Sequence, residues 1–156
     1  MSTLTLSTDE RRFDFAPAIF DTHFFDTIDY ADMPGMGDAR IDTTAHESGK
    51  TLHICVERKT AQDFAASIQN GLLFKEMESM MGGIRANNRE CETRNYNQQW
   101  FGVLLILGYP LSDTVTQGAL LRCQQFGAVI VNDNVFAYAY PEWLVNILIS
   151  HCPHYS

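Results

Sequence analysis

The feature that most restricts how this chain can fold is an unbroken apolar run at residues 100–107, WFGVLLIL. Such a run is typical of a strand that protein covers on both faces, because neither face then needs polar side chains. Gly108 and Pro110 follow directly and end the run. The run therefore predicts a central strand of a sheet.

The segments after this run alternate between helix and strand. Residues 112–126 have the spacing of a helix, residues 128–131 form a short apolar strand, and Pro141 suits the first turn of a last helix over residues 141–151. The inward side of the first of these helices is expected to carry Val115, Ala119, Leu120 and Cys123. Strand, helix, strand and helix in succession predict an α/β sandwich with right-handed crossovers.

The N-terminal third is expected to contain further strands. We expect a strand, a short helix, a second strand and a third strand at residues 3–8, 19–25, 27–30 and 37–42. The first strand would deliver Asp9 at its carboxyl end. Polar residues 43–50 end in Gly49-Lys50 and predict the turn of a hairpin, which would make the strands on either side of it antiparallel neighbours.

The densest group of chemically capable residues lies just after that turn. Leu52, Ile54 and Val56 alternate with other residues, which is the pattern of a strand with one buried face. The opposite face carries His53, Cys55, Glu57 and Lys59. A carboxylate and an ammonium group therefore project the same way from one strand.

A helix is expected after this strand. Thr60 has the character of an N-cap, with Asp63 at the third helical position, and Asn70-Gly71 is expected to interrupt or end the helix. The next segment, residues 76–99, begins with helical character, meets Gly82-Gly83 and continues as a polar stretch that favours an exposed loop.

Glu57 and Lys59 suit the hydrolysis of a phosphodiester bond. A carboxylate supplies an oxygen ligand for a hard divalent cation, and a lysine can position water or stabilise charge in the transition state. The predicted hairpin would bring Asp38 beside Glu57, close enough to share a cation. Asp42 is an alternative ligand, and the preceding glycine favours Asp38. Two histidines are candidate bases or ligands, or simply solvated residues, namely His46 and His53.

These residues carry a resemblance to a known family. Gly37-Asp38, followed after a gap by Glu57-Arg58-Lys59 and Asp63, is similar to the Gly-Asp and Glu-Arg-Lys-x-x-x-Asp signature of the XPF/Hef family of structure-specific endonucleases. The run VERKTAQDFAASIQNGLLFKE resembles that family's segment VERKS-x-x-D-L-x-x-S-I/L-x-x-G-R-L-Y-x-Q, and residues 6–11 resemble its first strand, which ends in Asp-x-Arg-Glu. The resemblance implies a restriction-endonuclease-like α/β fold, in which helices flank a mixed central sheet.

The same resemblance implies an activity and assigns roles to residues. It implies Mg²⁺- or Mn²⁺-dependent cleavage of DNA near junctions, flaps or forks, in repair, recombination or replication. The implied metal ligands are Asp38, Glu57, the backbone carbonyl of Arg58 and Asp9, with Lys59 as the catalytic lysine. The implied supporting residues are Asp63 and Arg11, and the implied DNA-binding residues are Arg58, Lys75, Arg85 and Arg89.

Three departures from the family pattern motivate a second hypothesis. Arg12 stands where the family has an acid, Leu72 stands where it has an arginine, and no acid or amide ends the strand near Leu107. The alternative is a non-catalytic nuclease-fold subunit that scaffolds or dimerises with an active nuclease. A third reading, a generic α/β domain with a chance Glu-Arg-Lys string, needs several separate coincidences. The active endonuclease is favoured because Asp38, Glu57 and Lys59 are all retained.

Composition limits the size and the partners of the protein. The chain has 156 residues, of which 46% are hydrophobic, which predicts a single domain over residues 1–156 without a helix-hairpin-helix module. Its formal net charge of −8 argues against strong independent binding to DNA. DNA binding would then use a local patch, metal ions or a partner. The family resemblance implies a homodimer, or a heterodimer with a nuclease-family or DNA-binding subunit, with the apolar surface of the helix at residues 141–151 as one interface; the alternative is that this surface is buried against the chain's own sheet.

The cysteines and the apolar segments point to an intracellular protein. Four cysteines are widely spaced without a Cys-x-x-Cys pair, which indicates neither a zinc site nor a disulfide framework. The N-terminus lacks the pattern of a signal peptide, and no apolar run approaches the ~18 residues of a membrane span. We expect no membrane partner and a location in a DNA-containing compartment, the nucleus in a eukaryote.

Overall fold

The computed structural model of the protein describes residues 2–8, 27–44, 48–108 and 112–133. Within these ranges, six strands form one sheet in the order β2-β1-β3-β4-β5-β6. The strands are β1 Ser2–Leu6, β2 Thr27–Tyr30, β3 Ala39–Thr44, β4 Thr51–Thr60, β5 Gln98–Leu107 and β6 Val129–Asp133. The helices are α2 Ala61–Gln69, α3 Leu72–Thr93 and α4 Thr114–Gln125. The expected strands at residues 3–8, 27–30 and 37–42 are therefore confirmed to within a few residues.

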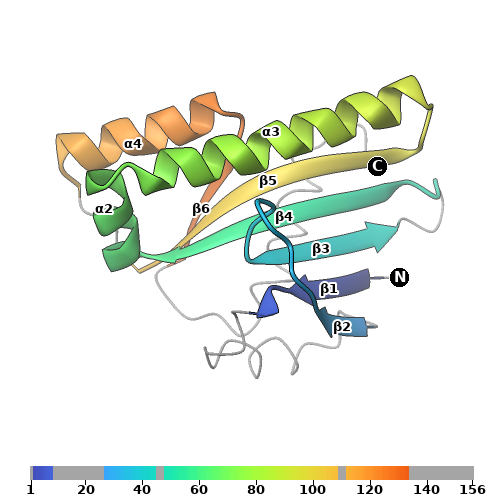
Figure 1. The fold of residues 1–156 in the computed structure, drawn as a ribbon, viewed down its shortest axis with the longest axis horizontal. Coiled ribbons are helices and arrows are strands. Elements are labelled where there is room, and N and C mark those ends of the chain that lie inside the picture. Colours follow the sequence, from blue (N-terminus) through green and yellow to red (C-terminus); the bar gives the residue numbers. More distant parts are fainter. Residues whose placement is uncertain (1, 9–26, 45–47, 109–111, 134–156) are drawn as a thin grey trace.

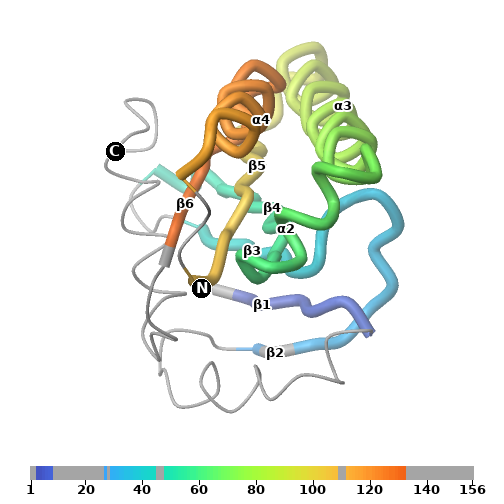
Figure 2. The backbone as a smooth tube through the Cα atoms, turned by 90° about the vertical axis from the view of Figure 1, so that its left-hand side faces the viewer, coloured from blue at the N-terminus to red at the C-terminus, as the bar shows by residue number. Residues whose placement is uncertain are grey.

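The sheet is mixed because two kinds of connection build it. The hairpin between β3 and β4 makes these two strands antiparallel, and β1 also pairs antiparallel with β3. Parallel neighbours need a crossover, and α2 with α3 supplies it between β4 and β5, while α4 supplies it between β5 and β6. The three helices gather over one side of the sheet (Figures 1 and 2).

The two faces of the sheet contribute to two separate apolar cores. Val103, Leu105 and Leu107 of β5 lie in a cluster whose members, among the residues that the structure describes, all come from strands. Leu104 and Ile106 lie on the opposite face, among buried side chains of α2, α3 and α4. The prediction of a central strand buried on both faces is thus confirmed. On β4, Leu52, Ile54 and Val56 join the strand cluster, while Cys55 belongs to the helix-covered core.

The helix after β4 begins and ends where the sequence predicts. The Thr60 hydroxyl accepts a hydrogen bond from the backbone N–H of Asp63 at 3.1 Å, which is the N-cap interaction. Asn70 caps the C-terminus, and Gly71 takes a left-handed φ of +74°, where a side chain would be strained. This turn sends the chain into α3 without an intervening loop.

The expectation of a loop after Gly82-Gly83 is wrong, because α3 continues to Thr93. Its buried residues recur at helical spacing on both sides of the two glycines, and they are Leu73, Met77, Met80, Met81, Ile84 and Cys91. Gly83 also meets a packing requirement, since a Cβ there would lie 2.8 Å from the sulfur of Met36. Packing against the sheet and the β2–β3 loop therefore outweighs the low helix propensity of glycine.

The C-terminal predictions have mixed outcomes. In α4, Ala119 and Cys123 are buried as expected, but Val115 is 67% exposed and Thr116 is buried in its place, so the inward position of Val115 was wrong. Asp113 caps this helix through the backbone N–H of Thr116. The expected helices at residues 19–25 and 141–151 lie outside the described residues. None of the helices in the described ranges is long and apolar enough to cross a membrane.

Candidate active site

Gly37 brings the β2–β3 loop into direct contact with β4. Its φ is +91°, and a Cβ at this position would lie 2.6 Å from the carbonyl oxygen of Val56. The next residue, Asp38, donates its backbone N–H to that same carbonyl at 2.7 Å. Both the conformation and the close approach exclude a side chain. The glycine before Asp38 is therefore required by the distance between the loop and β4.

The side chain of Asp38 is fixed at the start of β3. Its Oδ2 accepts a hydrogen bond from the backbone N–H of Arg58 at 2.8 Å. The pairing of Ala39 with Val56 continues the antiparallel register toward Asp38 and Glu57. The two acids proposed from the sequence thus come from adjacent antiparallel strands and lie next to each other, as the hairpin predicted.

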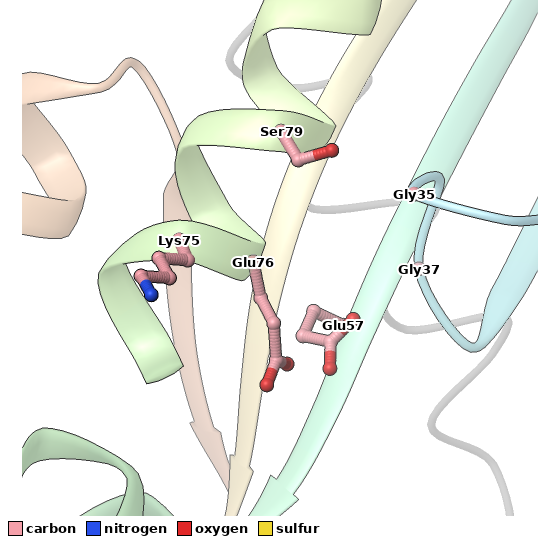
Figure 3. Close-up of a pocket in the computed structure, with 6 residues that line it drawn as sticks. All are labelled: Gly35, Gly37, Glu57, Lys75, Glu76 and Ser79. Carbon is pink, nitrogen blue, oxygen red and sulfur yellow. The ribbon is translucent and has the colours of Figure 1, made fainter. Parts of the chain in front are cut away.

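Glu57, Lys59 and a third acid, Glu76, meet between β4 and α3. The Lys59 Nζ lies 3.1 Å from Oε2 of Glu76 and 3.8 Å from Oε1 of Glu57. Figure 3 shows the side chains of Glu57 and Glu76 directed into the same space between the strand and the helix. The side chains of Lys59 and Glu57 are only 11% and 14% exposed, whereas that of Glu76 is 31% exposed. Two carboxylates therefore share one largely buried ammonium group.

This arrangement raises the pKa of both predicted acids. Burial is the largest cause for Glu57, and the negative charge of Asp38, a hydrogen bond with Glu76 and the charge of Glu76 add to it, so that its pKa rises to about 9 despite the opposing charge of Lys59. Burial also raises the pKa of Asp38, although the hydrogen bond and charge of Arg58 and the charge of Lys59 oppose the increase. The site thus holds acids that are costly to ionise.

A cavity of about 320 Å³ opens beside these acids. It is lined by Gly35, Gly37, Glu57, Lys75, Glu76 and Ser79. The β2–β3 loop forms one wall and the first turns of α3 form the other (Figure 3). Gly35 and Gly37 contribute no side chain to the first wall, so the cavity gives solvent access to Glu57 and Glu76, which line it.

The donors at this site fit a hard divalent cation. Carboxylate oxygens are the ligands that Mg²⁺ prefers, and a cation between Asp38 and Glu57 would offset the burial and the neighbouring negative charges that raise their pKa values. Within the described ranges, no group of three or more His, Cys, Asp or Glu side chains is arranged to hold a metal ion. The predicted ligand set includes one further acid, Asp9, which lies outside those ranges.

The competing candidates from the sequence lie away from this cavity. Asp42 accepts hydrogen bonds from Nε of Arg40 and from the ring of His53, which also contacts Gln98 and stacks on Trp100 at 4.2 Å. Burial alone would raise the pKa of Asp42, but the hydrogen bonds and charges of His53 and Arg40 outweigh burial and lower it. Geometry therefore favours Asp38 over Asp42 as the partner of Glu57. The other candidate histidine, His46, lies outside the described residues.

The remaining predicted site residues are scattered. Lys75 lines the cavity, and Figure 3 shows its side chain directed away from Glu57. The side chain of Arg85 donates to the carbonyl of Phe126 at 3.1 Å, which ties α3 to the end of α4, and Arg89 is exposed further along α3. Asp63 is exposed in the first turn of α2. The predicted supporting residue Arg11 lies outside the described residues.

Sequence reasoning missed Glu76, although the sequence contained a signal for it. Leu73, Met77 and Met80 form the buried stripe of α3. A residue directly before Met77 lies at the edge of that stripe, so its side chain can reach the sheet. Reading the period of this helix would have placed Glu76 at the edge of its buried face, although not beside a particular strand.

Comparisons with known proteins identify a matching family pattern and similar folds. The sequence pattern of the ERCC4 domain matches residues 14–124. Two similar solved structures are XPF from Aeropyrum pernix, with a TM-score of 0.63 and 19% identity over 92% of this chain and 65% of that one, and XPF from Aeropyrum pernix in complex with DNA, with a TM-score of 0.61 and 20% identity over 98% and 68%.

The fold prediction is confirmed by these neighbours, since the chain has the restriction-endonuclease-like fold of XPF nuclease domains. The chain spans about two thirds of the length of either solved structure. Comparison with curated protein sequences gives no match.

Proposed function

Since the chain belongs to the ERCC4 domain family of DNA nucleases, we propose that it is a metal-dependent endonuclease that hydrolyses phosphodiester bonds in branched or flap DNA. The observation that carries this proposal is the convergence of Asp38, Glu57 and Lys59, with Glu57 lining an open cavity. The raised pKa values of the two acids support it, because perturbed acids in a cavity are typical of catalytic sites.

The residues of the site divide the chemistry between them. Asp38, Glu57 and the backbone carbonyl of Arg58, with Asp9, would hold Mg²⁺ or Mn²⁺. The bound ion supplies Lewis acidity that lowers the pKa of a coordinated water. Lys59 then orients the attacking water or stabilises the negative charge that develops on the phosphate, and its burial strengthens that interaction because little water screens it.

DNA binding by this chain needs help from a partner. The proposal that DNA is the substrate is supported by the family and by the solved XPF relative in complex with DNA. Lys75 beside the cavity, Arg58 and the exposed Arg89 would contact phosphates. Three cations do not offset a formal net charge of −8, and counterion release from phosphates is the main source of nonspecific affinity. We propose that a dimer partner, a second copy or a related subunit, supplies the remaining contacts.

A second candidate is a non-catalytic nuclease-fold subunit. One observation favours it, namely that Leu72, which replaces an arginine of the family pattern, is 49% exposed at the start of α3. A leucine side chain cannot pair with a phosphate as the arginine of the family pattern can. The active enzyme remains the leading proposal because all three polar groups of the expected site converge.

Cleavage of branched DNA separates these proposals. The wild type, Asp38→Asn, Glu57→Gln and Asp42→Asn are incubated at low salt with labelled flap, fork and linear DNA, with Mg²⁺, Mn²⁺ or EDTA. The active-nuclease proposal predicts metal-dependent cleavage near the branch by the wild type and by Asp42→Asn, with loss in the other two. Wild-type protein that cuts nothing in the presence of its partner would favour the non-catalytic subunit. Cleavage by Glu57→Gln at the wild-type rate would refute the site.

A further inference from the structure

We propose that Glu76 is a positioning residue for Lys59, a role that rests on the proposed nuclease function. The closest ion pair of the Lys59 ammonium is with Oε2 of Glu76, at 3.1 Å, and its distance to Oε1 of Glu57 is 3.8 Å. The two residues come from different elements, since Lys59 lies near the end of β4 and Glu76 lies in the first turns of α3. Glu76 on α3 therefore holds the ammonium group of Lys59 on β4 in place.

The backbone of Glu76 is held by strong packing. Its neighbours Leu73, Met77 and Met80 are at most 1% exposed and lie in the core between α3 and the sheet. A functional group on a well-packed helix keeps a more precise position than one on a loop. Glu76 can thus act as a fixed anchor while its carboxylate, at 31% exposure, reaches the edge of the cavity.

Lys59 needs an anchor of this kind for two reasons. A lysine side chain has four rotatable bonds, and fixing it costs conformational entropy, which an ion pair in the ground state offsets before the reaction starts. Among the described residues, the ion pair that remains for Lys59 without Glu76 is with Glu57, the proposed metal ligand. The lysine and the cation would then compete for the same carboxylate. Glu76 draws the ammonium group toward itself and leaves Glu57 available.

The same carboxylate has a cost for substrate binding. Glu76 places a partly exposed negative charge at a cavity that must admit a phosphate. Removing the charge should therefore leave DNA binding unchanged or improved, while it releases Lys59. Loss of a merely structural residue would not lower kcat while KM stays unchanged or falls.

Kinetics of three variants test this prediction. We expect Glu76→Ala to lower kcat by about 10- to 100-fold, as the loss of supporting residues at metal sites typically does, without an increase in KM for flap DNA. Glu76→Gln keeps an oxygen acceptor for the Lys59 ammonium and should restore most of kcat. Glu78→Ala, which removes an exposed carboxylate two residues further along α3, is the matched control and should keep the wild-type constants. Equal kcat in Glu76→Ala and the wild type would overturn the inference.

A second readout does not depend on cleavage. Nuclear magnetic resonance of protein labelled with ¹⁵N-lysine reports the motion of each ammonium group, and the Lys59 signal is assigned by its loss in Lys59→Arg. We expect a restricted Lys59 ammonium in the wild type and in Glu78→Ala, and a mobile one in Glu76→Ala. A Lys59 signal that stays restricted in Glu76→Ala overturns the inference whether or not the chain cleaves DNA. A wild type that fails to cleave refutes the proposed function instead, and the Lys59 signal then decides the role of Glu76.

Discussion

The two ends of the β3–β4 hairpin carry polar clusters of opposite electrostatic character on the same face of the sheet. At one end, Asp42 is satisfied by Arg40 and His53, and its pKa is lowered. At the other end, Asp38 and Glu57 are crowded together, and the pKa of each is raised. Both clusters have similar residue types and lie on the same two strands. The comparison shows that acids whose pKa is raised by burial and neighbouring carboxylates, more than acids as such, mark the place where chemistry is expected.

The comparison is tested most strongly at the lysine. Lys59→Met keeps most of the side-chain length and removes the ammonium group at the crowded end, and we expect cleavage of flap DNA to fall by about 100-fold or more, because several kcal/mol of transition-state stabilisation are lost. Lys50→Met removes the same charge near the hairpin turn and should leave cleavage within about threefold of the wild type. Initial rates with Mn²⁺ give both values. If the two variants lose activity equally, the crowded end has no special role.

A second test uses the glycines at the two ends. Gly37→Ala should destabilise the protein by about 3 kcal/mol or more, because a positive φ is combined with a clash against the carbonyl of Val56. Gly49→Ala, at φ +66° in the hairpin turn, has open space around the added methyl group and should cost about 1 kcal/mol. Urea unfolding measures both free energies. Equal losses would show that the close approach of the loop to β4 does not constrain the site.

A third and smaller effect is the pH dependence of stability. The folded-state pKa of Glu57 is about 9, above its ordinary 4.5, so the wild type loses stability as the pH rises between these values. Glu57→Gln in EDTA should therefore unfold at a higher temperature than the wild type, by a margin that grows over the same pH range.

Asp42→Asn should behave in the opposite way. Because the folded-state pKa of Asp42 lies below its ordinary 3.8, its stabilising effect is present above that pH and is lost as the pH falls through the folded-state pKa. The variant should be less stable than the wild type at neutral pH and approach it in acid. Melting curves of both variants across the pH range provide the measurement, and a shift of the same sign for both would remove the contrast between the two ends.

Much of the fold could be predicted because local signals agree with the tertiary structure. Three local signals predicted the structure that is observed. They are the alternation of Leu52, Ile54 and Val56 in a half-buried strand, the N-cap at Thr60 and the apolar run of the buried strand β5. The glycines at 82 and 83 suggested that α3 ends there. Gly83 instead lies close to Met36, and a contact with a residue so distant in sequence could not be predicted. Val115 was misplaced because Thr116 points inward instead, and spacing alone does not fix the rotation of a short helix.

The candidate site could be predicted in part for a related reason. Glu57 and Lys59 share one strand, so their common direction follows from the strand period. Asp38 and Asp42 both suited the hairpin, and only the partners of each in the folded chain distinguish them. Glu76 reaches the site from a helix that follows the strand, so its contact with Lys59 depends on how α3 packs across β4.

The central claim is that Asp38 and Glu57 form a cation site, and calorimetric titration with Mn²⁺ tests it most directly. The wild-type chain should bind Mn²⁺, and Glu57→Gln and Asp38→Asn should each lose that binding while they remain folded. Asp42→Asn, with a carboxylate removed from the other end of the same strands, should bind Mn²⁺ as the wild type does. Binding that survives in Glu57→Gln, or that disappears only in Asp42→Asn, would contradict the account.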